Sequence, residues 1–286
     1  MSQYDLLGSV ESLMRIAIRA SDATTADRVA AAVSAVEGVT ARGVTDVADD
    51  STSSVADLLI TVGERALGAA AEAGESRPIL PLGLGVDSDT DGSSATPADR
   101  GANTDTPQSA SAEQTMLSAA ADTVGRLAAR DRIPTVTHRP LSLSASDDTA
   151  TAVCDCALLT TEPARISEYR ITTNGRSLAT FRADGVVVAT PLGSGGYNHA
   201  AGGPRLAPET GVAVTPVAPF ATRADDWVCS PPLSVTVERD DDVTVYADSR
   251  PFVSGSAGFS VTFAAGEPFF LVDWAALDTP QQLEKL

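Results

Sequence analysis

A block of small and conformationally permissive residues carries the clearest chemical signal in this sequence. Residues 184–204 read DGVVVATPLGSGGYNHAAGGP. The apolar run 186–188 predicts a buried strand, which Thr190 and Pro191 end. The glycines that follow predict a turn without bulky side chains, because such a turn lets backbone N–H groups approach a ligand closely. Tyr197 adds an aromatic face and a hydroxyl, so the block predicts a strand, a ligand-facing turn and a tightly packed segment.

The whole block resembles the signature of the ATP-NAD kinase family, DGxxxxTPTGSTAYxxSAGGP. The residues that match it in register are Asp184, Gly185, Thr190, Pro191, Gly193, Ser194, Tyr197, Ala201, Gly202, Gly203 and Pro204. Further along, 214–219 resembles the family's LTPICPH segment, with Phe220 where the His usually stands. Residues 245–250 resemble a strand ending in DGQ, of which only Asp248 is kept. The resemblance is strongest over about 165–250, and the AGGP ending favours NAD kinases over lipid kinases and phosphofructokinase-like proteins.

The resemblance implies a phosphotransferase that binds nucleotides in the cleft between two domains. ATP and NAD would give NADP and ADP, with a divalent metal such as Mg neutralising the triphosphate. Polyphosphate is an alternative phosphoryl donor. The family usually forms dimers or tetramers through its β domain, so the resemblance also implies a homo-oligomer.

The family's GGDGT turn is expected after the strand DLLITV, where residues 62–67 read VGERAL. By this resemblance Glu64 takes the place of the Asp that acts as general base on the adenosine 2′-hydroxyl. Gly63 is the one residue of the turn that is kept and would support a diphosphate. Arg65 replaces a glycine; it would be strained if the turn needs a positive φ, and it could bind a phosphate. Alternatively, Glu64 and Arg65 are ordinary residues of a first helical turn.

The family's second motif, an Asn-Glu pair, corresponds to Leu159 and Thr160, with Glu162 two residues later. Asp184 is alternatively a turn residue before a strand, and Tyr197 a plain core aromatic. The nucleotide-binding residues implied by the resemblance are Gly63, Arg65, Thr160, Asp184, Gly193, Ser194, Gly195, Gly196, Tyr197 and Ala200. Several polar groups of the family are replaced, so we expect weaker or altered recognition. A catalytically impaired paralogue, acting as a nucleotide-binding regulator or structural subunit, is the alternative.

The composition is strongly acidic, with 38 acidic and 20 basic residues and a formal charge of −18. Lys285 is the single lysine. This pattern resembles proteins of salt-loving organisms; the alternative is an acidic protein of ordinary habitat. Such a charge disfavours nucleic acid as a partner, because phosphates are repelled. No apolar run approaches the ~20 residues of a membrane span, and no leader is evident, so we expect a cytoplasmic protein.

The sequence has two histidines and three cysteines, and two histidines are too few for a His-rich metal site. The three cysteines are an odd number and suggest a reducing compartment. Cys154 and Cys156 are interpreted as two small buried thiols on one strand face, with a redox or metal pair as the alternative. Of the two histidines, we expect His138 on a strand or loop of the β domain. His199 is expected at the surface or behind the site.

The order of periodic segments predicts two domains. Strands are expected at 12–20, 57–62 and 78–84, and helices at 22–36, capped by Asp22 or Thr24, and at 66–73 and 115–129. This alternation predicts a parallel α/β nucleotide-binding domain over 1–134, with a disordered insertion at 87–114. Short alternating segments predict an all-β domain over 135–267, including a hairpin at Asn174-Gly175. A tail, 268–286, is expected to return to the first domain.

Overall fold

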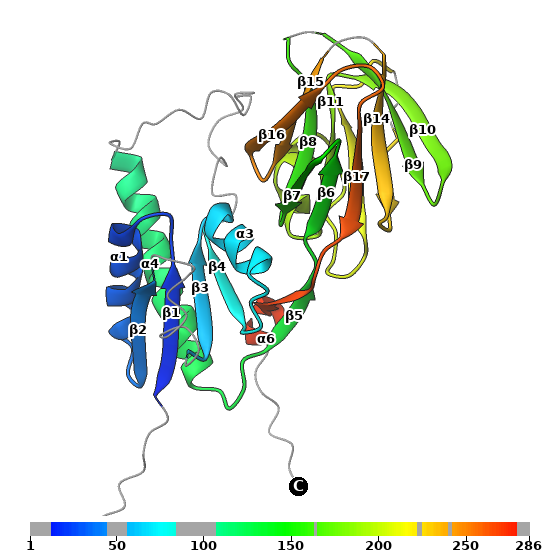
Figure 1. Ribbon diagram of the computed structural model, residues 1–286. Helices are drawn as coiled ribbons and strands as arrows, with labels where there is room; N and C mark the ends of the chain where they lie inside the picture. The colour runs from blue at the N-terminus through cyan, green and yellow to red at the C-terminus, as the bar shows by residue number, and fades with distance from the viewer. Residues whose placement is uncertain are drawn as a thin grey trace, which may run out of the picture.

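The computed structural model describes residues 13–44, 56–83, 107–162, 165–221, 225–239 and 242–278. The N-terminal domain is built on one six-stranded sheet in the order β2-β1-β3-β4-β18-β5 (Figure 1). Its strands are β1 (Met14–Arg19), β2 (Val39–Val44), β3 (Leu58–Val62), β4 (Ile79–Leu82), β5 (Thr135–His138) and β18 (Phe269–Val272). Every pair from β2 to β18 is parallel, and only β5 is antiparallel to its neighbour.

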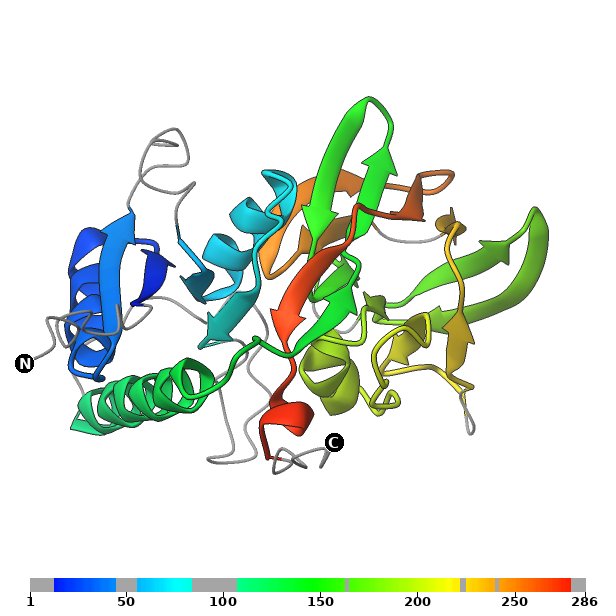
Figure 2. The same cartoon turned by 90° about the horizontal axis from the view of Figure 1, so that it is seen from below.

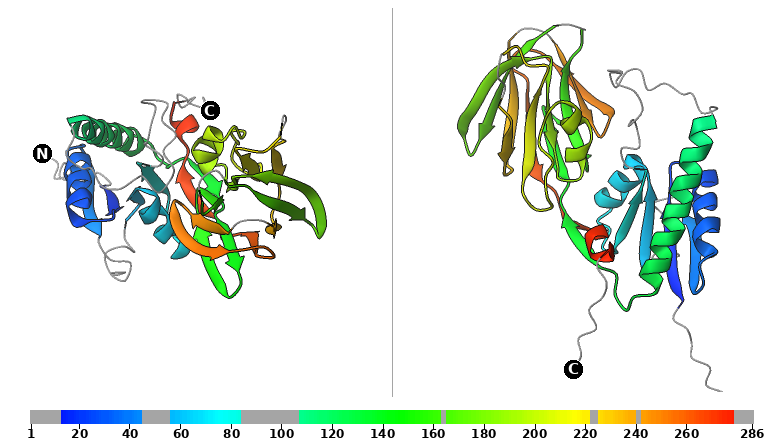
Figure 3. Two further views of the ribbon diagram at one scale, coloured as in Figure 1. Left: turned by 90° about the horizontal axis from the view of Figure 1, so that it is seen from above. Right: turned by 180° about the vertical axis from the view of Figure 1, so that it is seen from behind.

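Helices cover both faces of this sheet, as its continuous apolar strands require. Helices α1 (Ala23–Ser34) and α4 (Pro107–Ala128) pack on one face, in front of the sheet in the right-hand view of Figure 3. Helix α3 (Glu64–Glu72) packs on the other face. A short helix, α6 (Trp274–Asp278), follows β18. The expected parallel α/β domain is confirmed.

The C-terminal domain is a sandwich of two antiparallel sheets, which confirms the expected all-β domain. One sheet has the order β10-β9-β14-β17-β6-β7 and the other β13-β12-β11-β8-β15-β16. The strands of the first are β6 (Leu141–Ala145), β7 (Asp148–Ala152), β9 (Ser167–Thr173), β10 (Arg176–Ala183), β14 (Leu233–Arg239) and β17 (Ser260–Ala265). Those of the second are β8 (Asp155–Thr160), β11 (Gly185–Ala189), β12 (Val212–Val217), β13 (Trp227–Cys229), β15 (Val243–Ala247) and β16 (Arg250–Gly255). The main core of the domain lies between the two sheets.

Local signals in the sequence correspond closely to local geometry. Asp22 caps α1 by accepting the backbone N–H of Thr25 at 2.8 Å. Asn174 and Gly175 have φ values of 50° and 71° and join β9 to β10. Two successive positive φ angles are what a two-residue hairpin turn needs, which explains the Asn-Gly pair.

Three features differ from the sequence predictions. Helix α4 begins at Pro107, so part of the segment expected to be disordered is helical; proline fits a first helical turn because no N–H is needed there. The remainder, 87–106, lies outside the described residues. Strand β5, which was expected to open the β domain, pairs with β18 in the first sheet (Figure 2). His138 is the β5 residue opposite Phe269 in this pairing. Strand β2 has no strong alternation and was not predicted.

Across the part of the chain that the structure describes, no helix combines the length and the apolar character needed to cross a membrane.

Candidate functional site

The glycine-rich block forms a turn against the second sheet of the sandwich, and residues 190–204 are called the lip below. Thr190 follows β11 and is fully buried. Its hydroxyl lies 2.8 Å from the carbonyl oxygen of Val153 and 2.9 Å from that of Cys154. A Cβ on Gly193 would lie 2.2 Å from the Cys154 carbonyl oxygen, so only glycine fits there. The start of the lip is therefore fixed on the backbone of residues 153 and 154.

The middle of the lip is held by buried polar side chains. The Ser194 hydroxyl donates to the Pro191 carbonyl at 2.7 Å and accepts the N–H of Leu206 at 2.9 Å. Asn198, which is fully buried, donates to the carbonyl oxygens of Ser194 and Pro204 and accepts the hydroxyl of Thr215 at 2.7 Å. These hydrogen bonds occupy Ser194 and Asn198 with the shape of the lip itself.

Gly203 is required by the same network. A Cβ at this position would lie 2.3 Å from the hydroxyl oxygen of Thr215 and 2.4 Å from the amide oxygen of Asn198. Gly202 adopts a φ of 100°, in the region that favours glycine. The AGGP ending thus reflects close packing.

Tyr197 opens the short helix α5 (Tyr197–Ala200) and lies half-buried on the outer face of the second sheet. It packs there on a small apolar cluster that includes Leu159 and Tyr246. Burial raises the pKa of the Tyr197 hydroxyl, and the nearby carboxylates of Asp155 and Asp184 raise it further. The Tyr197 ring therefore lies within electrostatic reach of the Asp155 and Asp184 carboxylates.

Asp248 fastens the backbone on which the lip rests. It is 5% exposed, and its carboxylate accepts the N–H groups of Val153 and Cys154 at 2.8 Å and of Asp155 at 3.2 Å. Burial raises its pKa to about 6, the three amide hydrogen bonds oppose this, and the carboxylate of Glu64 adds to the rise. The retained Asp of the DGQ motif is thus a structural anchor.

Residues 62–67, called the first-domain turn, lie on the side of the N-terminal domain that faces residues 153–155 and Asp248. Gly63, at the end of β3, has a φ of 81°, which explains why a glycine is kept there. Glu64 is the first residue of α3, and its carboxylate raises the pKa of both Asp248 and Cys154. Glu64 therefore lies at the boundary between the domains, near the backbone that supports the lip.

Arg65 is the second residue of α3, is exposed and does not have a positive φ. The conformational penalty considered for an arginine in place of glycine therefore does not arise. Glu64 and Arg65 do form a first helical turn, and a helix N-terminus favours an acidic residue such as Glu64.

The two residues at the places of the Asn-Glu pair make internal contacts. Leu159, like Tyr197, packs against the small apolar cluster on the outer face of the second sheet. The Thr160 hydroxyl donates to the carbonyl of Arg165 at 3.0 Å, and its N–H donates to the carbonyl of Asp184 at 2.9 Å. Glu162 forms an ion pair with Arg165 at 3.2 Å. The polar groups of Thr160 and Glu162 are therefore bonded to other residues of this protein.

The outer part of the lip is open. Gly195, Gly196 and Ala200 are exposed, as is His199, whose Nδ1 lies 3.5 Å from the Gly203 carbonyl. A Cβ on Gly195 would lie 3.2 Å from a guanidinium nitrogen of Arg205. Arg205 therefore fills the space that a larger residue at 195 would need.

The cysteines are free and buried, as expected. Cys154 precedes β8 and packs with the first domain, whereas Cys156 points into the sandwich core, so the two thiols do not share one face. Among the described residues, no group of three or more His, Cys, Asp or Glu side chains could hold a metal ion.

Sequence reasoning missed Asn198 and Arg205, because both stand where the family signature does not specify a residue. It also missed that Glu64 lies near Asp248. The buried polarity of Asn198 between two glycine-rich stretches was the available signal, since a buried amide needs several partners.

Together, the parallel α/β layer, the β sandwich and the glycine-rich lip define a two-domain fold of the NAD kinase type. A solved NAD kinase from Archaeoglobus fulgidus, in complex with ATP, matches it with a TM-score of 0.58 and 22% sequence identity over 91% of this chain and 94% of that one. Yeast NADH kinase, complexed with NADH, matches with a TM-score of 0.63 and 16% identity, covering 96% of this chain and 90% of that one. At these identities the likeness concerns the fold.

Residues 155–270, somewhat less than half of the chain, match the model of the ATP-NAD kinase C-terminal domain, so this part of the chain carries that domain. The NAD kinase of Methanopyrus kandleri is 34% identical over 129 residues, which are 44% of this chain and 47% of the relative. That of Methanosarcina acetivorans is 40% identical over 92 residues, 32% of this chain and 34% of the relative. The chain thus spans about half the length or less of these curated relatives.

Proposed function

We propose that this protein binds NAD and an ATP-type nucleotide where the lip meets the first-domain turn, and that it phosphorylates the 2′-hydroxyl of NAD to give NADP. The observation that carries the proposal is that two partly matching family motifs converge. Glu64 of the first domain lies close enough to influence Asp248 and Cys154, and Asp248 fixes the backbone under the lip. Glu64 and Asp248, which are far apart in sequence, thus lie around the same backbone segment under the lip.

In this proposal Glu64 takes the proton of the 2′-hydroxyl as general base. The oxygen attacks the terminal phosphorus of ATP, a new P–O bond forms, and the bond to the β,γ-bridging oxygen breaks to release ADP. Gly63 allows backbone N–H groups to approach the diphosphate, and Arg65 places a cation at the same helix end. Any divalent metal enters as part of the ATP substrate, because the described residues offer no cluster to hold one, and no step is assigned to it.

The catalytically impaired alternative is favoured by Leu159 and Thr160. Leu159 offers no polar group to a ribose or amide, and the Thr160 hydroxyl is already bonded to Arg165. A protein that binds a nucleotide through Tyr197 and the lip, without transferring phosphate, fits these contacts. Glu64 would then serve only as a helix N-terminal acid.

A comparison of the wild type with three variants of Glu64 separates the two functions. The wild type is supplied with NAD, a divalent metal and ATP or polyphosphate, and NADP is measured enzymatically. If Glu64 is the base, Glu64→Gln lowers the rate by about 10²- to 10⁴-fold, while Glu64→Asp keeps a carboxylate and retains activity. Wild-type activity no higher than that of Glu64→Ala excludes the kinase. Calorimetry with NAD, NADP and ATP then distinguishes a nucleotide binder from a protein that binds none.

We also propose that the protein forms a homo-oligomer through its β domain. Phe220 is 75% exposed and Val228 is 53% exposed, and both belong to that domain. Exposed apolar side chains of this size support an interface between copies. Light scattering of Phe220→Ser with Val228→Ser tests this: the double variant should have a lower mass than the wild type, and an unchanged mass contradicts the proposed surface.

A further inference from the structure

A cavity lies beside the first residues of the lip, at the junction where the chain crosses between the domains. Its volume is about 320 Å³, room for about ten water molecules at ~30 Å³ each. Its walls include residues 137–141, which form the first crossover, and Ala265, at the end of β17 before the second. The two crossovers are joined there, because the N–H of Gly266 donates to the Pro140 carbonyl at 2.8 Å.

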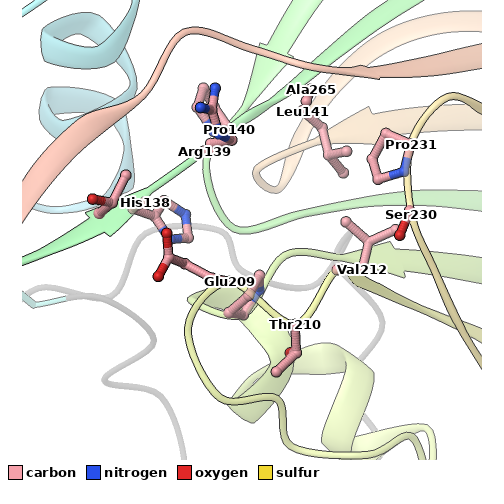
Figure 4. Close-up of a pocket in the computed structure, with 13 residues that line it drawn as sticks. His138, Arg139, Pro140, Leu141, Glu209, Thr210, Val212, Ser230, Pro231 and Ala265 are labelled. Carbon is pink, nitrogen blue, oxygen red and sulfur yellow. The ribbon is translucent and has the colours of Figure 1, made fainter.

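The polar groups of the cavity carry both signs of charge. Arg139 and Glu209 both line it, and no ion pair between them is found among the described residues. The Arg139 guanidinium donates a long hydrogen bond of 3.4 Å to the Gly266 carbonyl. In Figure 4 Glu209 points toward His138, whereas Arg139 extends away from both. The cavity thus has separate anionic and cationic sides.

His138 adds a hydrogen-bond acceptor on the side of Glu209. It is 6% exposed, its Nε2 lies 3.1 Å from the Val153 carbonyl oxygen, and its ring meets the Phe269 ring edge-on at 5.1 Å between centroids. A carbonyl can only accept, so Nε2 carries the proton. Burial lowers the pKa of His138, which keeps the ring neutral and leaves Nδ1 as an acceptor.

The geometry points to a second small-molecule site in this cavity, for a free zwitterion of the α-amino-acid class. The ligand's ammonium group donates to His138 Nδ1 and pairs with Glu209, and its carboxylate pairs with Arg139. Pro140, Pro191 and other apolar wall residues surround the small side chain. A simple anion or a simple cation would pair with only one of these two charged side chains, whereas a zwitterion can pair with both.

The site is connected to the lip through one peptide segment. The Val153 carbonyl that holds His138 is also within 2.8 Å of the Thr190 hydroxyl, and the Val153 N–H donates to Asp248 at 2.8 Å. Pro191, the next residue of the lip, itself lines the cavity. A ligand that fixes His138 therefore acts on the backbone that supports the lip, which provides a physical route for coupling to nucleotide binding.

Nitrogen-15 NMR of the imidazole rings tests the site directly, because the chain has only two histidines and His199 is an internal control. The full-length protein is titrated with L-alanine, trimethylglycine, acetate and ethylammonium. We expect L-alanine to shift the Nδ1 resonance of His138 and not that of His199. Trimethylglycine keeps both charges but has no N–H to donate, so it should not produce this shift, and acetate and ethylammonium should bind at least about tenfold more weakly than L-alanine.

Variants of Glu209 and Arg139 then test whether these side chains bind the ammonium and the carboxylate of the ligand. Glu209→Gln and Arg139→Gln should each weaken L-alanine binding at least about tenfold, since each removes a charged hydrogen bond. Glu37→Gln and Arg176→Gln, which change exposed residues elsewhere, should leave it unchanged. The inference is wrong if L-alanine leaves His138 unshifted in the folded wild type, if acetate binds as well as L-alanine, or if both cavity variants behave like their controls. These readouts need no kinase activity and do not depend on the proposed function.

Discussion

The lip and the first-domain turn face the same boundary, yet they are built differently. In the lip, Thr190, Asn198 and Gly203 are buried and locked by hydrogen bonds or by contacts too close for another residue. In the turn, Gly63 has no atom within 4 Å of an added Cβ, and Arg65 is exposed. The lip therefore keeps its family residues for packing reasons, whereas in the turn the restriction at Gly63 comes from its positive φ and not from close contacts.

This difference changes what a motif match means. The polar atoms of Ser194, Asn198 and Asp248 form hydrogen bonds with the protein's own backbone or side chains. The match of Ser194 and Asp248 to the family motifs, and the role of Asn198 in shaping the lip, are therefore evidence for the fold and not for catalysis. Under the proposed function, the chemistry depends instead on Glu64 and on the exposed residues Gly195 and Gly196, where this chain departs from the family signature.

The largest expected effect on stability is that of a methyl group at Gly193. Gly193→Ala forces a Cβ to within 2.2 Å of the Cys154 carbonyl oxygen, so the free energy of unfolding should fall by about 3 kcal/mol. Gly68→Ala, inside α3 and with no atom within 4 Å, should instead raise it by about 0.5–1 kcal/mol. Urea denaturation measures both. Equal effects of the two changes would show that the lip is no more tightly packed than the turn's helix.

The next effect concerns pH. The folded pKa of Asp248, about 6, is above its ordinary value, so the folded state binds the proton more tightly than the unfolded state. Its contribution to stability is therefore full below pH ~4 and is lost as pH rises through 6. Relative to Asp248→Asn, the wild type should gain about 2 kcal/mol between pH 7.5 and pH 4.5.

Denaturation of both proteins across this pH range checks the sign, because the other acidic groups are common to the pair. Glu64→Gln in the same series should reduce the gain, since its carboxylate contributes to the raised pKa of Asp248. A difference between the wild type and Asp248→Asn that does not vary with pH would contradict the assignment.

A smaller effect is expected at Thr190. Thr190→Val removes the hydroxyl that contacts the Val153 and Cys154 carbonyls and receives the Gly193 N–H, and should cost about 1–2 kcal/mol. Thr190→Ser keeps the hydroxyl and should recover most of this loss. Thermal unfolding distinguishes the two; a serine variant as unstable as the valine variant would show that the methyl group contributes as much to stability as the hydroxyl.

The smallest effect on stability is expected where the lip is open. Gly195→Thr introduces the family's residue and displaces the exposed guanidinium of Arg205, so stability should change by less than about 0.5 kcal/mol. Under the proposed function, nucleotide affinity should change more than stability. Calorimetry with NAD, using Arg205→Ala as the matched variant, measures this, and a strongly unfolded Gly195→Thr protein would place residue 195 with the packed part of the lip.

The sequence alone determined most local elements and the likeness of residues 155–270 to the ATP-NAD kinase C-terminal domain. Asp22 caps a helix, Asn174-Gly175 makes a hairpin turn, and β3 and β11 are read from their apolar runs, because these signals depend on neighbours in the chain. Strand β2 was missed because its mixed residues gain their stability from pairing with β1.

Only the tertiary structure decided which groups meet. The placement of His138 in the first sheet follows from pairing with Phe269, and the approach of Glu64 to Asp248 follows from how the two domains pack. The tertiary structure also shows that the hydroxyls of Ser194 and Thr160 donate hydrogen bonds to carbonyl groups within the protein. The physical reason is that hydrogen-bond partners and burial are set by distances across the fold, which residue types and spacing do not specify.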